Sequence, residues 1–499
     1  MAHSSSNITI LAALLFVGVV AQDIQAQNRE EFDAYAKRKR EEFAKYKDER
    51  QAEFNRYREQ YNREFAEYLR QAWKQVKPEE KVIPPPQPKP FVPKPVIDDV
   101  KPFPVVPKEI PILEIVKPKT VPPAPKPIVI EKPKEERSQK HIRLDLFYGN
   151  DFTLRYSEKV KISVTDNTQF SIAKAWEQAA TTELDPLVYD CQQARAEYNF
   201  CDWMYYLFVK EVAHVVTQTA DDSNEETLLV GYILAQSGVD FRFVRNENRL
   251  LLALPFDTQI YKCSYFSVED KNYYVVEKDV QSACYLMDRS FCKEASVLTL
   301  RIASPMNLEY SGNESKVLAS KKYPEMHVEL TGNKWLMDFY NSYPRMDWQE
   351  YSLAPMDRGN ADAIVDTFSP LIAGKSEQEA VNMILNFVQT AFTYGYDDRI
   401  WGGDRPFFAD ETLYYPYSDC EDRSILFAHL LRSLTNQDVV LLHYPNHLAT
   451  AVRFSTDLPG DYVIVDGQKY LVCDPTGYKP VGNAYDEFKN VQAKVIRIR

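Results

Sequence analysis

A proline-rich segment divides this 499-residue chain and limits how it can fold. Eighteen of the 31 prolines lie between residues 78 and 133, where they alternate with Lys and Val. Proline removes backbone hydrogen-bond donors and favours an extended conformation. We therefore expect residues 78–140 to form an extended, semi-rigid linker, with separate structural units before and after it.

The segment before the linker repeats every eleven residues. Phe recurs at Phe32, Phe43, Phe54 and Phe65, and Tyr follows three positions later at Tyr35, Tyr46, Tyr57 and Tyr68. Eleven residues match three turns of a straight helix, so residues 27–77 are expected to form one long helix with an aromatic stripe. An aromatic stripe needs a partner surface. Self-association into a bundle and packing against the chain's own body both remain open.

The first residues suggest export from the cell. An apolar run over residues 8–21 has the length of a signal-peptide core, and Ala21 and Ala26 offer cleavage points. We expect residues 1–26 to be a signal peptide of a periplasmic, cell-envelope or secreted protein. An uncleaved membrane anchor is the alternative. The net charge of -12 argues against nucleic acid as a partner.

After the linker, helical and strand patterns alternate, and we expect an α+β architecture in two units, residues 141–345 and 346–499. Helices are predicted over residues 202–217, 225–236 and 376–391, with a further helix beginning near Cys420. Strands are predicted over residues 142–148, 241–243, 249–254, 273–277, 297–302, 439–443, 449–454, 462–465, 470–473 and 494–498.

Three residues of the last unit suggest catalysis. Cys420 opens a predicted helix, His447 precedes a predicted strand, and Asp474 follows another in Asp474-Pro475-Thr476. A helix N-terminus favours a thiolate, an imidazole can accept the thiol proton, and a carboxylate can orient the imidazole. Taken singly, each residue has a commoner structural explanation. We predict a Cys–His–Asp site because all three fall at element ends within one unit.

The remaining chemistry of the sequence is sparse. The acidic neighbours Asp419, Glu421 and Asp422 oppose thiolate formation, so the thiolate would depend on His447; Asp419 and Asp422 could instead cap the helix. His443 and His447 could join Cys420 and Cys473 around a metal, but the turn at Pro445 and Asn446 makes this the weaker interpretation, and no metal is expected. No glycine-rich phosphate loop is present, so no organic cofactor is expected.

The seven cysteines contain no paired CxxC motif. In an exported chain, Cys191 with Cys201 and Cys263 with Cys284 are candidate disulfides. The spacing does not fix the connectivity.

On these residues the last unit resembles the transglutaminase-like superfamily, in its exported bacterial type, which shares the papain-like cysteine-enzyme core. The similarity rests on Asp419-Cys420 at the helix start, on His447 and on Asp474-Pro475-Thr476. The chain departs from the family pattern at Ser418, where Gly is usual, and at Ala449, where an aromatic residue is common. Trp401, Tyr415 and Tyr417 are candidates for the family's oxyanion-stabilising aromatic residue.

The resemblance implies a cysteine enzyme acting on peptide or protein amides through a thioester on Cys420. Water as the acceptor would make it a peptidase or amidase, and an amine would make it an acyltransferase. The alternative is a catalytically inactive scaffold or binding protein displayed on the helix and linker. The helix beginning near residue 225 and the strands after it repeat the rhythm of the Cys420 region, with Asn224 in the cysteine's position. Residues 141–345 are therefore either a degenerate copy of the last unit or an ordinary succession of helices and strands.

Overall fold

The computed structural model describes residues 29–85, 106–118, 120, 124–127, 140–219, 223–312, 315–395 and 405–498. The predicted signal peptide lies outside these residues. The chain separates into two compact units, residues 1–60 and 61–499. The fold is α+β, as expected from the sequence. In the described part, no helix is both long enough and apolar enough to cross a membrane.

Helix α2 (Arg29–Leu69) covers most of the eleven-residue repeats. Tyr46 and Tyr57 are each 55% exposed, so these members of the aromatic stripe face solvent. The last repeat differs, because Phe65 is buried and packs against Trp176 and Phe291, with ring centroids 4.6 and 5.3 Å apart. The end of the helix thus belongs to the core of residues 61–499.

The helices of the second unit include all those predicted. Their bounds are α3 (Gln169–Ala179), α4 (Asp185–Glu197), α5 (Asp202–Thr217), α6 (Asn224–Gln236), α7 (Lys334–Asn341), α8 (Trp348–Leu353), α9 (Arg358–Ile372), α10 (Glu377–Ala391), α12 (Ala409–Tyr414) and α13 (Cys420–Leu434). Ser376 caps α10 through a capping box with Glu379, which fixes its start where the sequence predicts it. Helix α12 lies within a segment for which no regular structure was expected.

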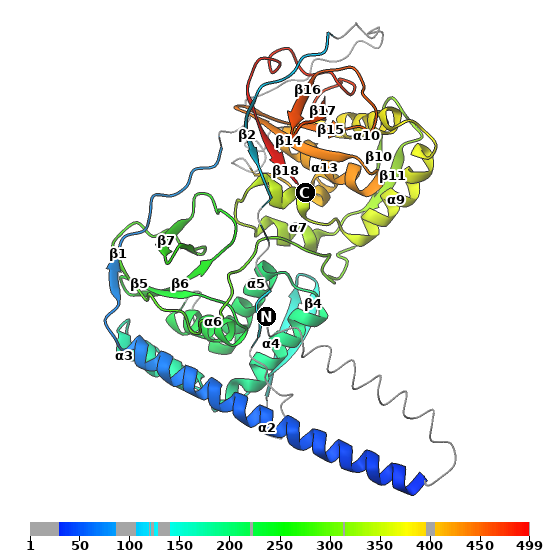
Figure 1. Ribbon diagram of the computed structural model, residues 1–499. Helices are drawn as coiled ribbons and strands as arrows, with labels where there is room; N and C mark the ends of the chain where they lie inside the picture. The colour runs from blue at the N-terminus through cyan, green and yellow to red at the C-terminus, as the bar shows by residue number, and fades with distance from the viewer. Residues whose placement is uncertain are drawn as a thin grey trace. The chain divides into compact units, whose positions relative to one another are not determined.

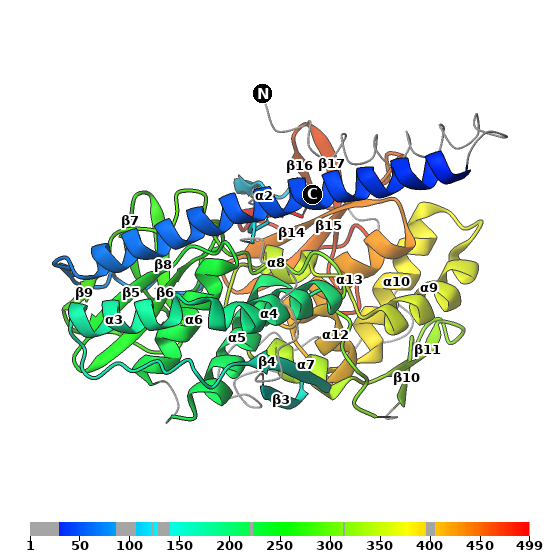
Figure 2. The same cartoon turned by 90° about the horizontal axis from the view of Figure 1, so that it is seen from below.

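The first sheet has the strand order β1-β9-β5-β6-β8-β7. Its strands are β1 (Lys74–Val76), β5 (Arg242–Asn246), β6 (Arg249–Pro255), β7 (Ser264–Val268), β8 (Lys271–Val275) and β9 (Cys284–Leu286). All its pairs are antiparallel. Helices α3 and α6 lie beside its strands in Figure 2.

The second sheet has the order β16-β17-β15-β14-β18-β2; in Figure 1 its strands are orange and red, except for β2, which is cyan-blue. Its strands are β2 (Ile112–Val116), β14 (Asp438–Tyr444), β15 (His447–Arg453), β16 (Tyr462–Val465), β17 (Gln468–Cys473) and β18 (Ala493–Arg497). Only the edge strand β2 is parallel to its neighbour. Helix α13 packs on β14 and β15.

The smaller sheets are hairpins or short pairs. They comprise β3 (Lys140–Phe147) with β4 (Asn150–Tyr156), β10 (Ser315–Ala319) with β11 (His327–Thr331), and β12 (Thr393–Tyr394) with β13 (Tyr417–Ser418). The strand predicted over residues 297–302 is wrong: Ser296 and Leu298 form only isolated bridges. The alternating apolar residues of this segment are buried, but the segment does not form a continuous strand with a neighbour.

The described part of the proline-rich segment is not a free spacer. Its strand β2 pairs with β18, and Glu109 bridges to Tyr462. Near its start, the carbonyl of Val82 accepts a hydrogen bond from the backbone of Lys262 at 2.9 Å. The short non-proline run after Pro111 allows a strand, because proline is tolerated at the ends and edges of sheets.

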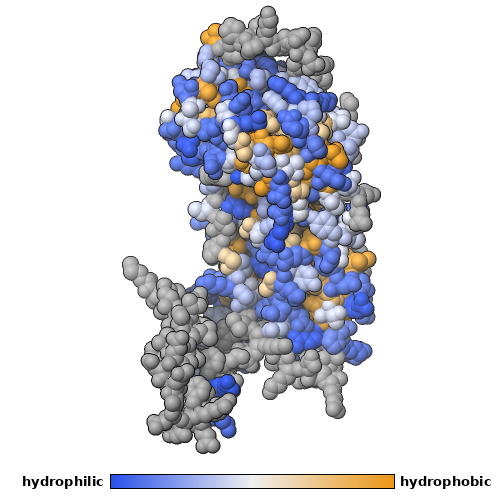
Figure 3. Space-filling model, turned by 90° about the vertical axis from the view of Figure 1, so that its right-hand side faces the viewer, coloured by the Kyte–Doolittle hydropathy of each residue, from blue (hydrophilic) through white to orange (hydrophobic). Residues whose placement is uncertain are grey.

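Both faces of each of the two six-stranded sheets carry apolar side chains. One face joins a large core shared with the helices, and the opposite faces hold smaller clusters, such as that of Val440, Leu442 and Tyr444. On the face drawn in Figure 3, hydrophobic residues form small patches among hydrophilic ones. All seven cysteines are free thiols, so the structure contains neither of the expected disulfides.

Candidate active site

Cys420 is the first residue of α13, and its surroundings fix the start of that helix. Asp419 is the N-cap, and its backbone N–H donates to Asp422 Oδ2 at 3.1 Å. The other oxygen of Asp422 accepts from the backbone N–H of Phe407 at 2.9 Å. The carboxylate of Asp422 therefore accepts from two backbone donors, one of them at the N-cap, which is the capping role considered for it from the sequence. Cys420 itself is fully buried.

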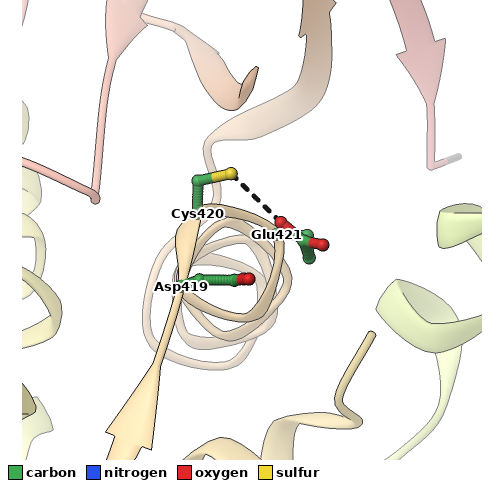
Figure 4. A group of neighbouring side chains, drawn as sticks. All are labelled: Asp419, Cys420 and Glu421. Atoms are coloured by element: carbon green, nitrogen blue, oxygen red, sulfur yellow. Dashed lines mark hydrogen bonds between the residues drawn. The ribbon is translucent and has the colours of Figure 1, made fainter. Parts of the chain in front are cut away.

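Three polar groups surround the thiol of Cys420: the carboxylates of Glu421 and Asp419 and the backbone N–H of Leu448. The thiol donates a hydrogen bond to Glu421 Oε2 at 3.0 Å, whereas Asp419 points across the end of the helix (Figure 4). The backbone N–H of Leu448 lies beside the sulfur and favours its charged form. Burial raises the pKa of the Cys420 thiol well above its usual value, the charges of Glu421 and Asp419 raise it further, and the Leu448 amide opposes them. In this arrangement the thiol is held neutral.

His447 and Asp474 are brought together as predicted. His447 is the first residue of β15 and pairs with Tyr444 across the turn that joins β14 to β15. Asp474 directly follows the last residue of β17. His447 Nε2 lies 2.7 Å from Asp474 Oδ2. The backbone N–H of Thr476 donates to Asp474 Oδ1 at 2.9 Å, which holds the carboxylate toward the imidazole. Both side chains are buried.

An aromatic residue lies over the imidazole. The ring of Phe488 is stacked on that of His447, with centroids 4.7 Å apart and planes 12° from parallel. Phe488 also stacks on Tyr444 at 4.9 Å. It belongs to the long connection between β17 and β18. Together with Asp474, this ring restricts the orientation of the imidazole.

The first turn of α13 is attached to the strand that carries His447. The backbone N–H of Leu448, the next residue after His447, lies beside the Cys420 sulfur, and the Leu448 carbonyl accepts a hydrogen bond from Ser424 Oγ at 2.9 Å. The backbone of β15 therefore lies directly against the reactive end of the helix. Asp474 engages Nε2 of the imidazole, so Nδ1 is the ring nitrogen on the side away from that carboxylate.

Arg423 ties the segments around the site together. Its buried guanidinium donates to Ser418 Oγ at 3.1 Å and to the carbonyls of Gln389, Phe392 and Thr476 at 3.3, 3.0 and 3.1 Å. The side-chain amide of Gln389 in turn donates to the carbonyl of Asp474 at 2.9 Å. The end of α10, the residues before Cys420 and the turn after Asp474 thus share one buried network.

Several of these residues carried no sequence signal for the site. Glu421 was noted only as an acidic neighbour, and nothing in the sequence brings Arg423, Gln389 or Phe488 to the three predicted residues. The capping pattern at Asp419 and Asp422 is the one detail that local sequence contains.

The other residues weighed from the sequence have different outcomes. Trp401 lies outside the described residues. Tyr417 is exposed, and Tyr415 accepts a hydrogen bond from Asn341 at 3.3 Å. His443 packs against Trp348, with ring centroids 4.7 Å apart. The ligand atoms of Asp419, Cys420 and Glu421 lie within 4.8 Å of one another, and the thiol–carboxylate hydrogen bond accounts for that proximity.

Comparison with protein-family models, curated proteins and solved structures finds no match for this chain.

Proposed function

We propose that this protein is a cysteine enzyme acting on amide bonds of peptides or proteins, with Cys420, His447 and Asp474 as its catalytic residues. One observation carries the proposal: His447 is held by Asp474 at 2.7 Å, while the backbone N–H of Leu448, the next residue in the chain, lies beside the Cys420 sulfur. A thiol at the start of α13, an imidazole at the start of β15 and a carboxylate held against that imidazole after β17 support this assignment.

In the proposed reaction His447 Nδ1 accepts the proton of the Cys420 thiol, and the sulfur attacks the carbonyl carbon of the substrate. The carbon–nitrogen bond breaks, the amine leaves with the proton from His447, and a thioester remains on Cys420. Water or a second amine then attacks the thioester, giving an acid or a new amide and restoring the thiol. Asp474 stabilises the imidazolium formed in between. Peptidase, amidase and acyltransferase activity all follow from this scheme.

The order of elements supports a transglutaminase-like, papain-like fold for the last unit. A buried helix opens with the cysteine, the histidine begins a later strand, and the aspartate follows a further strand of the same sheet. In the family resembled, the same three residues hold the same places. No cofactor or metal ion is required by this chemistry.

A second candidate is an inactive scaffold or binding protein. Its support is the Cys420–Glu421 hydrogen bond at 3.0 Å together with the complete burial of the thiol. A carboxylate beside the sulfur favours the neutral thiol, and a buried site admits no substrate without a change of conformation. The two candidates therefore differ in whether Cys420 is reactive near neutral pH.

Alkylation of the full chain with iodoacetamide at pH 6 to 7, followed by peptide mass spectrometry, separates the two candidates. Cys473 is the internal control, since it is also fully buried and its sulfur donates to the carbonyl of Leu471. For an enzyme, Cys420 is labelled faster than Cys473, and His447→Ala slows only Cys420. Equal labelling would favour the scaffold, and faster labelling of Cys420 in Glu421→Gln would identify Glu421 as the restraining group.

For an active chain, the acceptor can be found by incubation with a peptide library with and without an added amine. Release of free acids in both samples identifies a hydrolase, whereas new amides in the second identify an acyltransferase. Cys420→Ser is the control and is expected to abolish both products.

We further propose an exported protein that is associated with the cell envelope or secreted and that self-associates through α2. The exposed Tyr46 and Tyr57 support this, since aromatic side chains that recur along a helix provide a surface for a partner helix. Sedimentation of the full chain and of a Tyr46→Glu, Tyr57→Glu variant tests it. A smaller particle for the variant is expected, and identical monomers would refute self-association.

A further inference from the structure

The two large sheets have the same connectivity. Reading the first sheet from its far edge gives β7-β8-β6-β5-β9-β1, and the second gives β16-β17-β15-β14-β18-β2. In each case a buried helix is followed by a hairpin, a second hairpin and a further strand beside the first hairpin. An edge strand completes each sheet, but β1 is antiparallel to β9 whereas β2 is parallel to β18. We infer that the unit from α5 to β9 is a second, chemically silent copy of the candidate catalytic unit, with Asn224, Arg249 and Glu277 at the positions of Cys420, His447 and Asp474.

The helix starts correspond first. Asn224 is the first residue of α6, as Cys420 is of α13, and each follows an N-cap residue, Ser223 or Asp419. In α6 the backbone N–H of the third residue, Glu226, donates to Ser223 Oγ at 3.1 Å. In α13 the side chain of the third residue, Asp422, accepts from the backbone N–H of Asp419 at 3.1 Å. The same two positions therefore form the cap in both helices, although the two hydrogen bonds run in opposite directions.

The side chain at the first helical position faces the same strand residue in both copies. The backbone N–H of Leu250 donates to Asn224 Oδ1 at 2.7 Å, and the backbone N–H of Leu448 lies beside the Cys420 sulfur. Leu250 is the second residue of β6, as Leu448 is of β15. Asn224 also donates to the carbonyl of Asn248 at 3.2 Å. The amide thus takes over the packing role of the thiol without its chemistry.

The hairpin register assigns the base position. Asn246 pairs with Arg249 across a two-residue turn in the first sheet, and Tyr444 pairs with His447 across a two-residue turn in the second. Arg249 is therefore the counterpart of His447. A guanidinium stays protonated at any ordinary pH, so it cannot serve as a general base.

The neighbouring strand assigns the carboxylate. Leu254 pairs with Tyr274, and its counterpart Val452 pairs with Leu471. Three residues further along the chain lie Glu277 and Asp474 respectively. Glu277 accepts from Tyr206 at 2.5 Å and lies 3.1 Å from Lys210 Nζ.

In the first copy the carboxylate of Glu277 therefore contacts two residues of α5 and holds no imidazole. Asn224 is not a nucleophile and Arg249 is not a base, so the first copy is silent. Of the two copies, only the one containing Cys420 therefore has a thiol and an imidazole at these positions. This inference does not depend on whether that centre is catalytic.

Hydrogen–deuterium exchange of the full chain, read by mass spectrometry with fragmentation to single residues, tests the correspondence. Asn224→Ala is expected to speed exchange of the Leu250 amide on the order of tenfold, and Cys420→Ala to do the same for Leu448. Asn248→Ala is the matched control, because its backbone acceptor remains. Unchanged Leu250 exchange in Asn224→Ala would overturn the correspondence. If that variant does not fold, Asn224→Asp keeps the acceptor, and slow exchange there supports the correspondence whereas fast exchange overturns it.

The silence of the first copy is tested with Asn224→Cys in a Cys420→Ser background. Its labelling by iodoacetamide is expected to rise with pH as for an ordinary thiol and to be unchanged by Arg249→Ala. Rapid labelling at pH 6 that depends on Arg249 would overturn silence. Because these readouts require no substrate, failure of the proposed enzymatic function leaves them intact.

Discussion

Replacement of Arg423 by Met tests whether the buried guanidinium holds the candidate site together. The side chain donates to the carbonyls of Gln389, Phe392 and Thr476 and to Ser418 Oγ. Met has a similar length but no donor. Three buried carbonyls would lose this donor, and each unsatisfied group costs roughly 1–3 kcal/mol.

Part of this cost is offset because the variant no longer buries a cation, and burial already lowers the pKa of Arg423. We expect a net loss of about 2–5 kcal/mol in the free energy of unfolding. Arg423→Lys keeps the charge but cannot span all the acceptors, so an intermediate loss is expected. Urea denaturation followed by tryptophan fluorescence measures the change, and the site is followed by Cys420 labelling.

The control for this series is Arg453→Met, at the exposed end of β15, which should change the unfolding free energy by no more than about 0.5 kcal/mol. The reasoning is refuted if Arg423→Met is as stable as this control and labels Cys420 at the wild-type rate. In that case the three carbonyls would find other donors, and the network would not position the site.

Three further outcomes follow from the structure. Burial and the nearby Asp357 raise the pKa of Asp410 from 3.8 to about 7, so the folded state retains its proton to higher pH than the unfolded state. The free energy of unfolding should fall as pH rises from about 4 to 7, by at most about 4 kcal/mol from this group, and Asp410→Asn should remove that fall in melting experiments at pH 5 and 8. Phe488→Ala should slow Cys420 labelling several-fold by releasing the His447 ring, whereas Phe488→Tyr should keep the wild-type rate; equal rates for both would show that stacking is not needed. Ile115→Pro should break the pairing of β2 with β18 and lower the melting temperature, and an unchanged value would show that the edge strand is dispensable.

The sequence predicted the regular elements of the last unit well because their periodicity is strong. The helix at residues 376–391 has both a capping box and an apolar face, and the strands from residue 439 onward have β-branched or aromatic cores. The strand expected over residues 297–302 failed for a different reason. Alternating apolar and polar residues indicate that one side of a segment is buried, and a buried segment without regular structure produces the same pattern as a strand.

The close pairing of His447 with Asp474 agrees with the sequence-based expectation, but the surroundings of Cys420 could not be foreseen. Asp419, Glu421, Asp422 and Arg423 have the composition of a solvated helix start, yet all four are buried. Their burial depends on elements distant in sequence, such as the end of α10, and no local pattern encodes those contacts. The prediction of an extended linker over residues 78–140 did not foresee the pairing of β2, because its partner β18 lies far along the chain, at residues 493–497.

That partner has a consequence for biosynthesis. β18 is inserted between β14 and β2, and it comprises residues 493–497 of 499. While the chain is emerging from the ribosome, β2 has no strand to pair with, and β14 keeps one unsatisfied edge until residues 493–497 have been synthesised. The second sheet, which contains the strand carrying His447, can therefore close only once these residues are available, so deletion of residues 493–497 should leave an open, aggregation-prone edge.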